Sequence, residues 1–180
     1  MIANDLVNDI AYGRLSTRGA KTAVLGQILF LALALIIPTI THRLGLNFRV
    51  AQPMHWMILF AGLAYGPISG MILGLSVPLA SFLTTGMPLP GMLPLMLPEL
   101  AAYGLFAGLF KGKLTAFGSV AVAQVAGKLV FLVLVAATGG LNLPVLEFIR
   151  ATWGPGLFAM ILQIVFLPLL AGLYVNWARD

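Results

Sequence analysis

The chain has 180 residues, of which 61% are hydrophobic and only 8% are charged. Soluble domains carry about 25% charged residues, so this composition excludes an ordinary soluble protein and indicates a membrane protein. The net charge of +5 comes from Lys and Arg residues that mostly flank apolar segments. That placement is typical of topology control and speaks against nucleic acid as a partner. Cysteine is absent, which excludes disulfides, thiolate nucleophiles and cysteine metal sites.

From the N-terminus, residues 1–21 are polar and are expected to form a cytoplasmic segment before a single transmembrane domain, 22–180. Apolar windows of about 20 residues, the length that crosses a bilayer, predict six helices there. They cover residues 23–41, 53–64, 67–85, 93–110, 114–138 and 154–177. The second is short enough to be a re-entrant piece instead, and residues 139–152 suit a short interfacial helix. The predicted fold is an all-α membrane protein, a bundle of six transmembrane helices.

The basic residues orient this bundle. With six spans, six of them share the face of the two termini: Arg14, Arg18, Lys21, Lys111, Lys113 and Arg179. Three share the opposite face: Arg43, Arg49 and Arg150. Because Lys and Arg are enriched on the cytoplasmic side of membranes, both termini are predicted to be cytoplasmic.

Glycines recur every four residues in two places along the chain. One row is Gly62, Gly66, Gly70 and Gly74, and the other is Gly104, Gly108 and Gly112. Small residues at this spacing let helix backbones approach closely in a membrane. The rows are expected to pack helices inside the chain, with a docking face for another membrane subunit as the alternative.

Two ionisable residues, Glu99 and Lys128, lie within membrane-length apolar sequence. A charge at bilayer depth costs about 2.5–3.5 kcal/mol even on the insertion scale, so it normally faces a cavity or a partner. The favoured hypothesis is a polar binding pocket in the outer half of the bundle. There Lys128 would meet an anionic or carbonyl group, and Glu99 would accept hydrogen bonds from a ligand. The alternative is that the two residues pair with each other as an internal ion bridge.

Further pocket candidates follow from helical spacing and depth. Gln124 lies four residues before Lys128, and Tyr103 lies four residues after Glu99, so each shares a helical face with its charged neighbour. Gln163 lies at a comparable depth in the last span. His55 and Trp56 are the two remaining pocket candidates. His55 and Trp56 stand near the outer end of the second span, where a solvated histidine and an interfacial aromatic belt explain them equally well.

Motifs for catalysis are missing from the sequence. It holds no phosphate-binding loop, no His-Glu-x-x-His and no Gly-x-Ser-x-Gly. Only two histidines, His42 and His55, are present, so a metal site is poorly supported. We therefore predict no catalytic residue, metal or cofactor, and a binding protein in place of a pump.

Five runs of sequence stand out for their order of glycines and prolines: ALALIIP (32–38), PMHWM (53–57), LFAGLAYGPISG (59–70), PLASFLTTGMP (78–88) and PELAAYG (98–104). Together they resemble the substrate-binding S components of energy-coupling factor (ECF) vitamin transporters. The resemblance covers roughly residues 22–113, whereas the last two spans match only in length and hydrophobicity.

The resemblance implies a six-helix subunit in the cytoplasmic membrane of a prokaryote. Such a subunit captures a water-soluble vitamin from outside and docks on a transmembrane T subunit that carries two cytosolic ATPases. The family pocket lies at the outer ends of helices four to six, where Glu99 is the best-matched residue, under loops that correspond to residues 43–52 and 85–92. The segments around 53–55 and 85–88 look closest to members assigned to pantothenate, which makes this carboxylate the first candidate ligand.

Two other functions compete with the S component. One is a membrane-embedded enzyme acting on a lipid or prenyl substrate, with Glu99 as the acid–base residue and Lys128 as a phosphate or carbonyl clamp. The other is a structural membrane subunit in which the two residues only fix helix register.

Overall fold

The computed structural model describes residues 20–43 and 52–177, so almost all of the predicted N-terminal segment lies outside the described residues. The described chain is helical. Its helices are α2 (Ala20–Arg43), α4 (Pro53–Tyr65), α5 (Pro67–Thr85), α6 (Leu93–Phe110), α7 (Ala116–Ala137), α8 (Val145–Trp153), a 3₁₀ turn (Gly154–Gly156) and α9 (Leu157–Trp177). This result confirms the all-α prediction, and α5 and α6 have the bounds predicted from the sequence.

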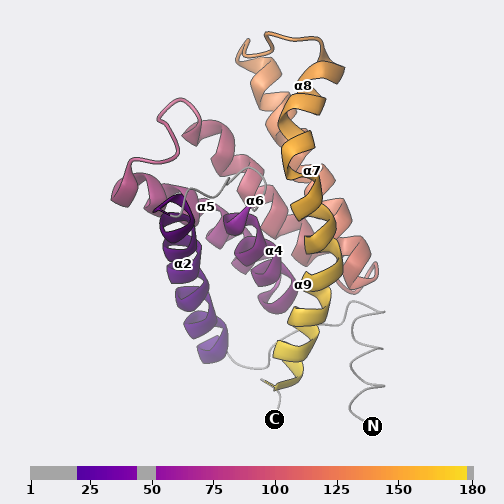
Figure 1. Ribbon diagram of the computed structural model, residues 1–180. Helices are drawn as coiled ribbons and strands as arrows, with labels where there is room; N and C mark the ends of the chain where they lie inside the picture. The colour runs from indigo at the N-terminus through magenta and orange to yellow at the C-terminus, as the bar shows by residue number, and fades with distance from the viewer. Residues whose placement is uncertain (1–19, 44–51, 178–180) are drawn as a thin grey trace.

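The long helices run alternately up and down, so that α2 begins and α9 ends at the same end of the bundle (Figure 1). We call that end the lower end, and the end with α8 and the α5–α6 loop the upper end. The predicted short helix before the last span is α8, which continues into α9 through the 3₁₀ turn. It lies above α9, and none of its residues is buried.

Helix α4 is short and occupies the centre of the bundle. Its 13 residues extend about 20 Å at 1.5 Å per residue, less than the roughly 30 Å hydrocarbon core of a bilayer. All residues from Ile58 to Ala64 are buried, and α4 contacts α2, α5, α6 and α9. Because neighbouring helices surround it, α4 does not have to cross the lipid alone.

A tight corner joins α4 to α5 at the lower end. Gly66 adopts φ 99°, a conformation that side-chain-bearing residues rarely take, and Pro67 begins α5 directly after it. Lys111, in the turn after α6, donates a hydrogen bond from Nζ to the carbonyl oxygen of Leu63 at 3.2 Å. Burial lowers the pKa of the Lys111 ammonium to about 8. The corner is thus fixed by a contact between α4 and the α6–α7 turn.

The repeated glycines form a seam between α6 and its two neighbours. A Cβ on Gly62 or Gly70 would collide with the backbone carbonyl of Gly104, and one on Gly108 would collide with the backbone of Pro67. This geometry confirms, for Gly62, Gly70, Gly74, Gly104 and Gly108, the prediction that the glycines pack helices within the chain. The seam leaves no room for another subunit at those positions.

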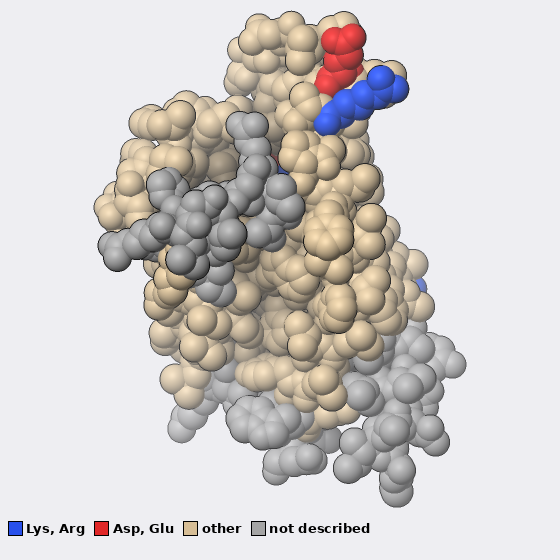
Figure 2. Space-filling view, viewed as in Figure 1, with Lys and Arg blue, Asp and Glu red and all other residues tan. Residues whose placement is uncertain are grey.

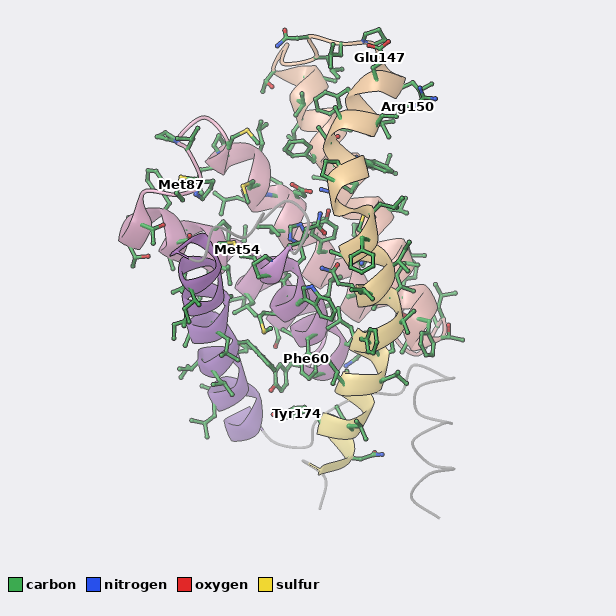
Figure 3. All side chains as sticks on the ribbon, viewed as in Figure 1. Met54, Phe60, Met87, Glu147, Arg150 and Tyr174 are labelled. Carbon is green, nitrogen blue, oxygen red and sulfur yellow. The ribbon has the colours of Figure 1, made fainter. Side chains whose placement is uncertain are left out.

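The outside of the bundle suits a lipid environment. Helices α5, α6, α7 and the continuous α8–α9 segment are each long and apolar enough to cross a membrane, and α2 contains a shorter apolar stretch. Large apolar side chains are exposed on their flanks, among them Leu25, Ile68, Val133 and Phe158. Figure 2 shows flanks that are almost entirely uncharged, with the most prominent charges at the top. Figure 3 places Glu147 and Arg150 there, on α8.

Aromatic side chains close the lower half of the bundle. The hydroxyl of Tyr65 donates a hydrogen bond to that of Tyr174 at 2.7 Å, joining α4 to α9. The rings of Phe60 and Tyr174 meet edge to face at 5.6 Å between centroids, and the ring of Phe30 packs on Phe60 at 4.8 Å. Figure 3 shows Phe60 and Tyr174 near each other in this half. The cluster ties α2, α4 and α9 together below the polar residues described next.

The glycine seam yields a stability prediction. Gly104→Ala introduces a methyl group against the backbone of Gly70, and overpacking of this kind costs about 1–3 kcal/mol. We expect a lower free energy of unfolding in a detergent-to-SDS titration. The control is Gly91→Ala, because a Cβ at Gly91 meets nothing within 4 Å. Equal stability of the two variants would contradict the role assigned to the seam.

Candidate functional site

A buried ion pair joins α6 and α7 in the upper half of the bundle. The Nζ atom of Lys128 lies 2.8 Å from Oε1 of Glu99, and the two side chains are 10% and 7% exposed. The same oxygen accepts a hydrogen bond from the hydroxyl of Tyr103 at 2.9 Å, one helical turn along α6. Two donors therefore converge on one carboxylate oxygen in a site that is nearly closed to solvent.

Glycine in α7 makes room for this arrangement. A Cβ on Gly127 would lie 2.6 Å from Cε1 of Tyr103, so only glycine allows the phenol ring to pack flat against α7. Tyr103 is 1% exposed. The Lys128 ammonium lies 6.0 Å from the ring centroids of both Tyr103 and Phe131, within the range of cation–π attraction. Two aromatic rings thus lie near the cation in addition to the carboxylate.

A second polar contact lies one turn away, between α7 and α9. Nε2 of Gln124 donates to Oε1 of Gln163 at 2.9 Å and to the carbonyl oxygen of Met160 at 3.2 Å. A main-chain carbonyl can only accept, so the amide of Gln124 is oriented with its nitrogen toward Met160. The remaining atoms, Oε1 of Gln124 and Nε2 of Gln163, are buried without a hydrogen-bond partner.

Helix α4 contributes a third part of the site from its first turn. The ring of His55 packs on that of Tyr103 at 4.9 Å between centroids, and both of its nitrogens are buried without a hydrogen-bond partner. Gln52, directly before α4, is also buried, and its Oε1 has no partner. Among the described residues, the buried polar side-chain atoms without a partner belong to Gln52, His55, Gln124 and Gln163, apart from Nε1 of Trp153 on α8. Buried polar atoms are nearly always paired in proteins, so these call for an explanation.

Six of the seven residues predicted for the pocket therefore lie in one region. We call this region, with Gln52 added, the polar layer: Gln52, His55, Glu99, Tyr103, Gln124, Lys128 and Gln163. The seventh, Trp56, is half-buried and packs against the apolar core. The expected free lysine is not observed, because Lys128 pairs with Glu99 as in the alternative considered above.

Sequence reasoning missed three contributors to the polar layer. Gly127 and Phe131 lie one residue before and three residues after Lys128, so the helical neighbours of an intramembrane charge were the available signal. Gln52 is a polar residue beside a helix-starting proline, but it was only included within the loop 43–52. Most of that loop lies outside the described residues. The loop 85–92 is described and is largely exposed.

Other site types find little support among the described residues. No group of three or more His, Cys, Asp or Glu side chains is close enough there to hold a metal ion. A hollow of about 290 Å³ lies between α2 and the end of α5, lined by Leu35, Ile36, Ile40, Thr84 and Thr85. Its lining is mainly apolar and includes no residue of the polar layer.

The ion pair yields a second stability prediction. Lys128→Met leaves Glu99 as an uncompensated buried charge, and breaking a buried pair in this way costs about 3–5 kcal/mol. We expect this loss in the free energy of unfolding, measured by SDS titration. The double variant Glu99→Gln/Lys128→Met should recover most of it, because no charge is then left unpaired. Additive losses in the double variant would contradict a direct pairing.

Comparison with known proteins supplies the family. The family model of the ECF transporter substrate-specific component matches residues 21–178, which is nearly the whole chain and includes the last two spans, where the sequence resemblance was limited to length and hydrophobicity. Neither the search of curated proteins nor the search of solved structures found a match. Members of this family are substrate-binding transport subunits of the prokaryotic cell membrane and are not ATPases. The chain belongs to the substrate-specific components of ECF transporters.

Proposed function

We propose that this chain captures a water-soluble vitamin or a related small molecule in the polar layer. The observation that carries the proposal is the set of buried polar atoms without partners around the Glu99–Lys128 pair. A membrane protein gains nothing in stability from such atoms, because each buried unsatisfied group costs free energy. A polar ligand that completes their hydrogen bonds accounts for their presence.

The same polar layer fits poorly with a purely structural role. An ion pair alone would fix the register of α6 and α7, but it would not require unpaired atoms on α4, α7 and α9. His55 and Gln163 lie on helices that the pair does not join. Convergence of unpaired groups from three helices favours a ligand site over a structural bridge.

The proposed orientation places the polar layer toward the outside. Six basic residues predicted on the side of the termini against three on the other favour cytoplasmic termini. Both Ala20 and Trp177 lie at the lower end, which would then be cytoplasmic (Figure 1). The aromatic cluster at Tyr65 and Tyr174 would separate the site from that side. Substrate would therefore enter from the upper end.

Import would depend on partner subunits. The sequence contains no phosphate-binding loop, so the chain has no means of its own to hydrolyse ATP by that route. As a member of this family, the chain would dock on a T subunit carrying two ATPases and release its ligand inside. The lipid bilayer is the third partner, in contact with the apolar flanks.

Pantothenate remains a candidate ligand on the sequence resemblance of residues 53–55 and 85–88. The electrostatic argument for it assumed that Lys128 would be free to meet a carboxylate. Because Lys128 is paired with Glu99, that argument loses its support. Pantothenate should therefore be tested as one of several vitamins and not as the sole candidate ligand.

An uptake assay tests the proposed function. Proteoliposomes would hold the chain with the T subunit and two ATPases of the same cell, and would receive a mixture of radiolabelled vitamins that includes pantothenate. We expect one vitamin to accumulate only with ATP and all four subunits. The chain alone should bind that vitamin without accumulating it, and liposomes lacking the chain serve as the control. Failure of the chain to bind any vitamin would contradict the proposal.

A further inference from the structure

We propose that the substrate held by the polar layer carries no net charge and presents both hydrogen-bond donors and acceptors. This inference rests on the proposed function, since it specifies the ligand of the same site. It differs from the expectation of a carboxylate ligand drawn from the sequence. Two independent features carry it, namely the balance of charge in the layer and the identity of its unpaired atoms.

The charges of the polar layer already cancel. Its ionised residues are Glu99 and Lys128, which form a direct pair at 2.8 Å. The other members are amides, a phenol and an imidazole. Both nitrogens of His55 are buried without a hydrogen-bond partner and its ring packs on Tyr103, so a positive charge on this imidazole would be buried without a compensating anion, which is costly. A neutral imidazole leaves the described layer with a net charge of zero.

A charged ligand would upset this balance at bilayer depth. A carboxylate beside Lys128 would share one cation with Glu99, which lies on the same ammonium and is itself fixed by the Tyr103 hydroxyl. One negative charge would then remain uncompensated in a poorly solvated site, which is costly. A cationic ligand would leave one positive charge in the same way. A ligand without net charge avoids both penalties.

The unpaired atoms show what the ligand must offer. Gln52 and Gln124 each leave a buried carbonyl oxygen that can only accept, so they need donors. Gln163 leaves an amide nitrogen that can only donate, so it needs an acceptor. A neutral His55 adds one donor and one acceptor. Amides, lactams and heterocycles with N–H and C=O groups present this mixture, whereas a simple carboxylate presents acceptors alone.

A charge-fractionated extract tests the proposal while the ligand is still unidentified. The water-soluble small molecules of yeast extract would be separated by ion exchange at pH 7 into neutral, anionic and cationic fractions. Each fraction would be added to the full chain in nanodiscs. The readouts are the thermal unfolding midpoint and the molecules retained after gel filtration. We expect the neutral fraction to raise the midpoint by several degrees and to leave about one molecule per chain.

The outcomes separate this inference from the proposed function. Stabilisation and retention by only the anionic or only the cationic fraction would overturn the charge assignment and leave the binding function intact. No effect from any fraction would overturn the binding function itself, and this inference with it.

A pair of matched variants adds a second readout. Glu99→Gln removes the compensating anion, so the layer would carry the charge of Lys128 and should retain molecules from the anionic fraction. Glu147→Gln removes an exposed carboxylate on α8 and should keep the preference of the wild type. An unchanged preference for the neutral fraction in Glu99→Gln would contradict the assignment of Glu99 as the charge that balances the site.

Discussion

The rest of the structure depends on the ion pair between Lys128 and Glu99. Either charge alone is costly at bilayer depth, so the two stabilise each other, and their contact sets the register at which α6 and α7 meet. That register brings Gly127 opposite Tyr103, so that the Tyr103 ring packs against α7. The Tyr103 hydroxyl then donates a hydrogen bond to the Glu99 carboxylate. The pair thus organises the polar layer that we assign to the substrate.

The two halves of the bundle meet different requirements. Toward the lower end, backbone contacts along the glycine seam and an aromatic cluster around Tyr65 and Tyr174 hold the helices together. Around the pair, the polar layer leaves buried hydrogen-bonding atoms unpaired. The short central α4 links both halves, with His55 at its upper end and Tyr65 at its lower end. This division is what a subunit needs if it binds from one side only.

Helix positions were predictable from the sequence, because proline and glycine mark where the apolar runs begin and end. For example, α5 begins at Pro67 and ends just before Gly86. Glu99 and Lys128 were found because charges are rare in such runs. Their pairing could not be decided, since it depends on how α6 and α7 rotate toward each other. In a membrane protein the lipid-facing and core-facing sides of a helix are both apolar, so periodicity does not report that rotation. For the same reason the sequence could not predict that Gln124 contacts Gln163 or that Tyr103 packs against Gly127 of α7.

The central claim is that the polar layer is where the substrate binds, and native mass spectrometry of the chain released gently from its membrane tests it most directly. We predict a wild-type mass that includes about one small molecule per chain. That molecule should be lost in His55→Phe, which removes two unpaired nitrogens of the polar layer, and kept in Tyr65→Phe, which removes a hydrogen bond at the lower end. Equal retention of the molecule by His55→Phe and the wild type would contradict the account.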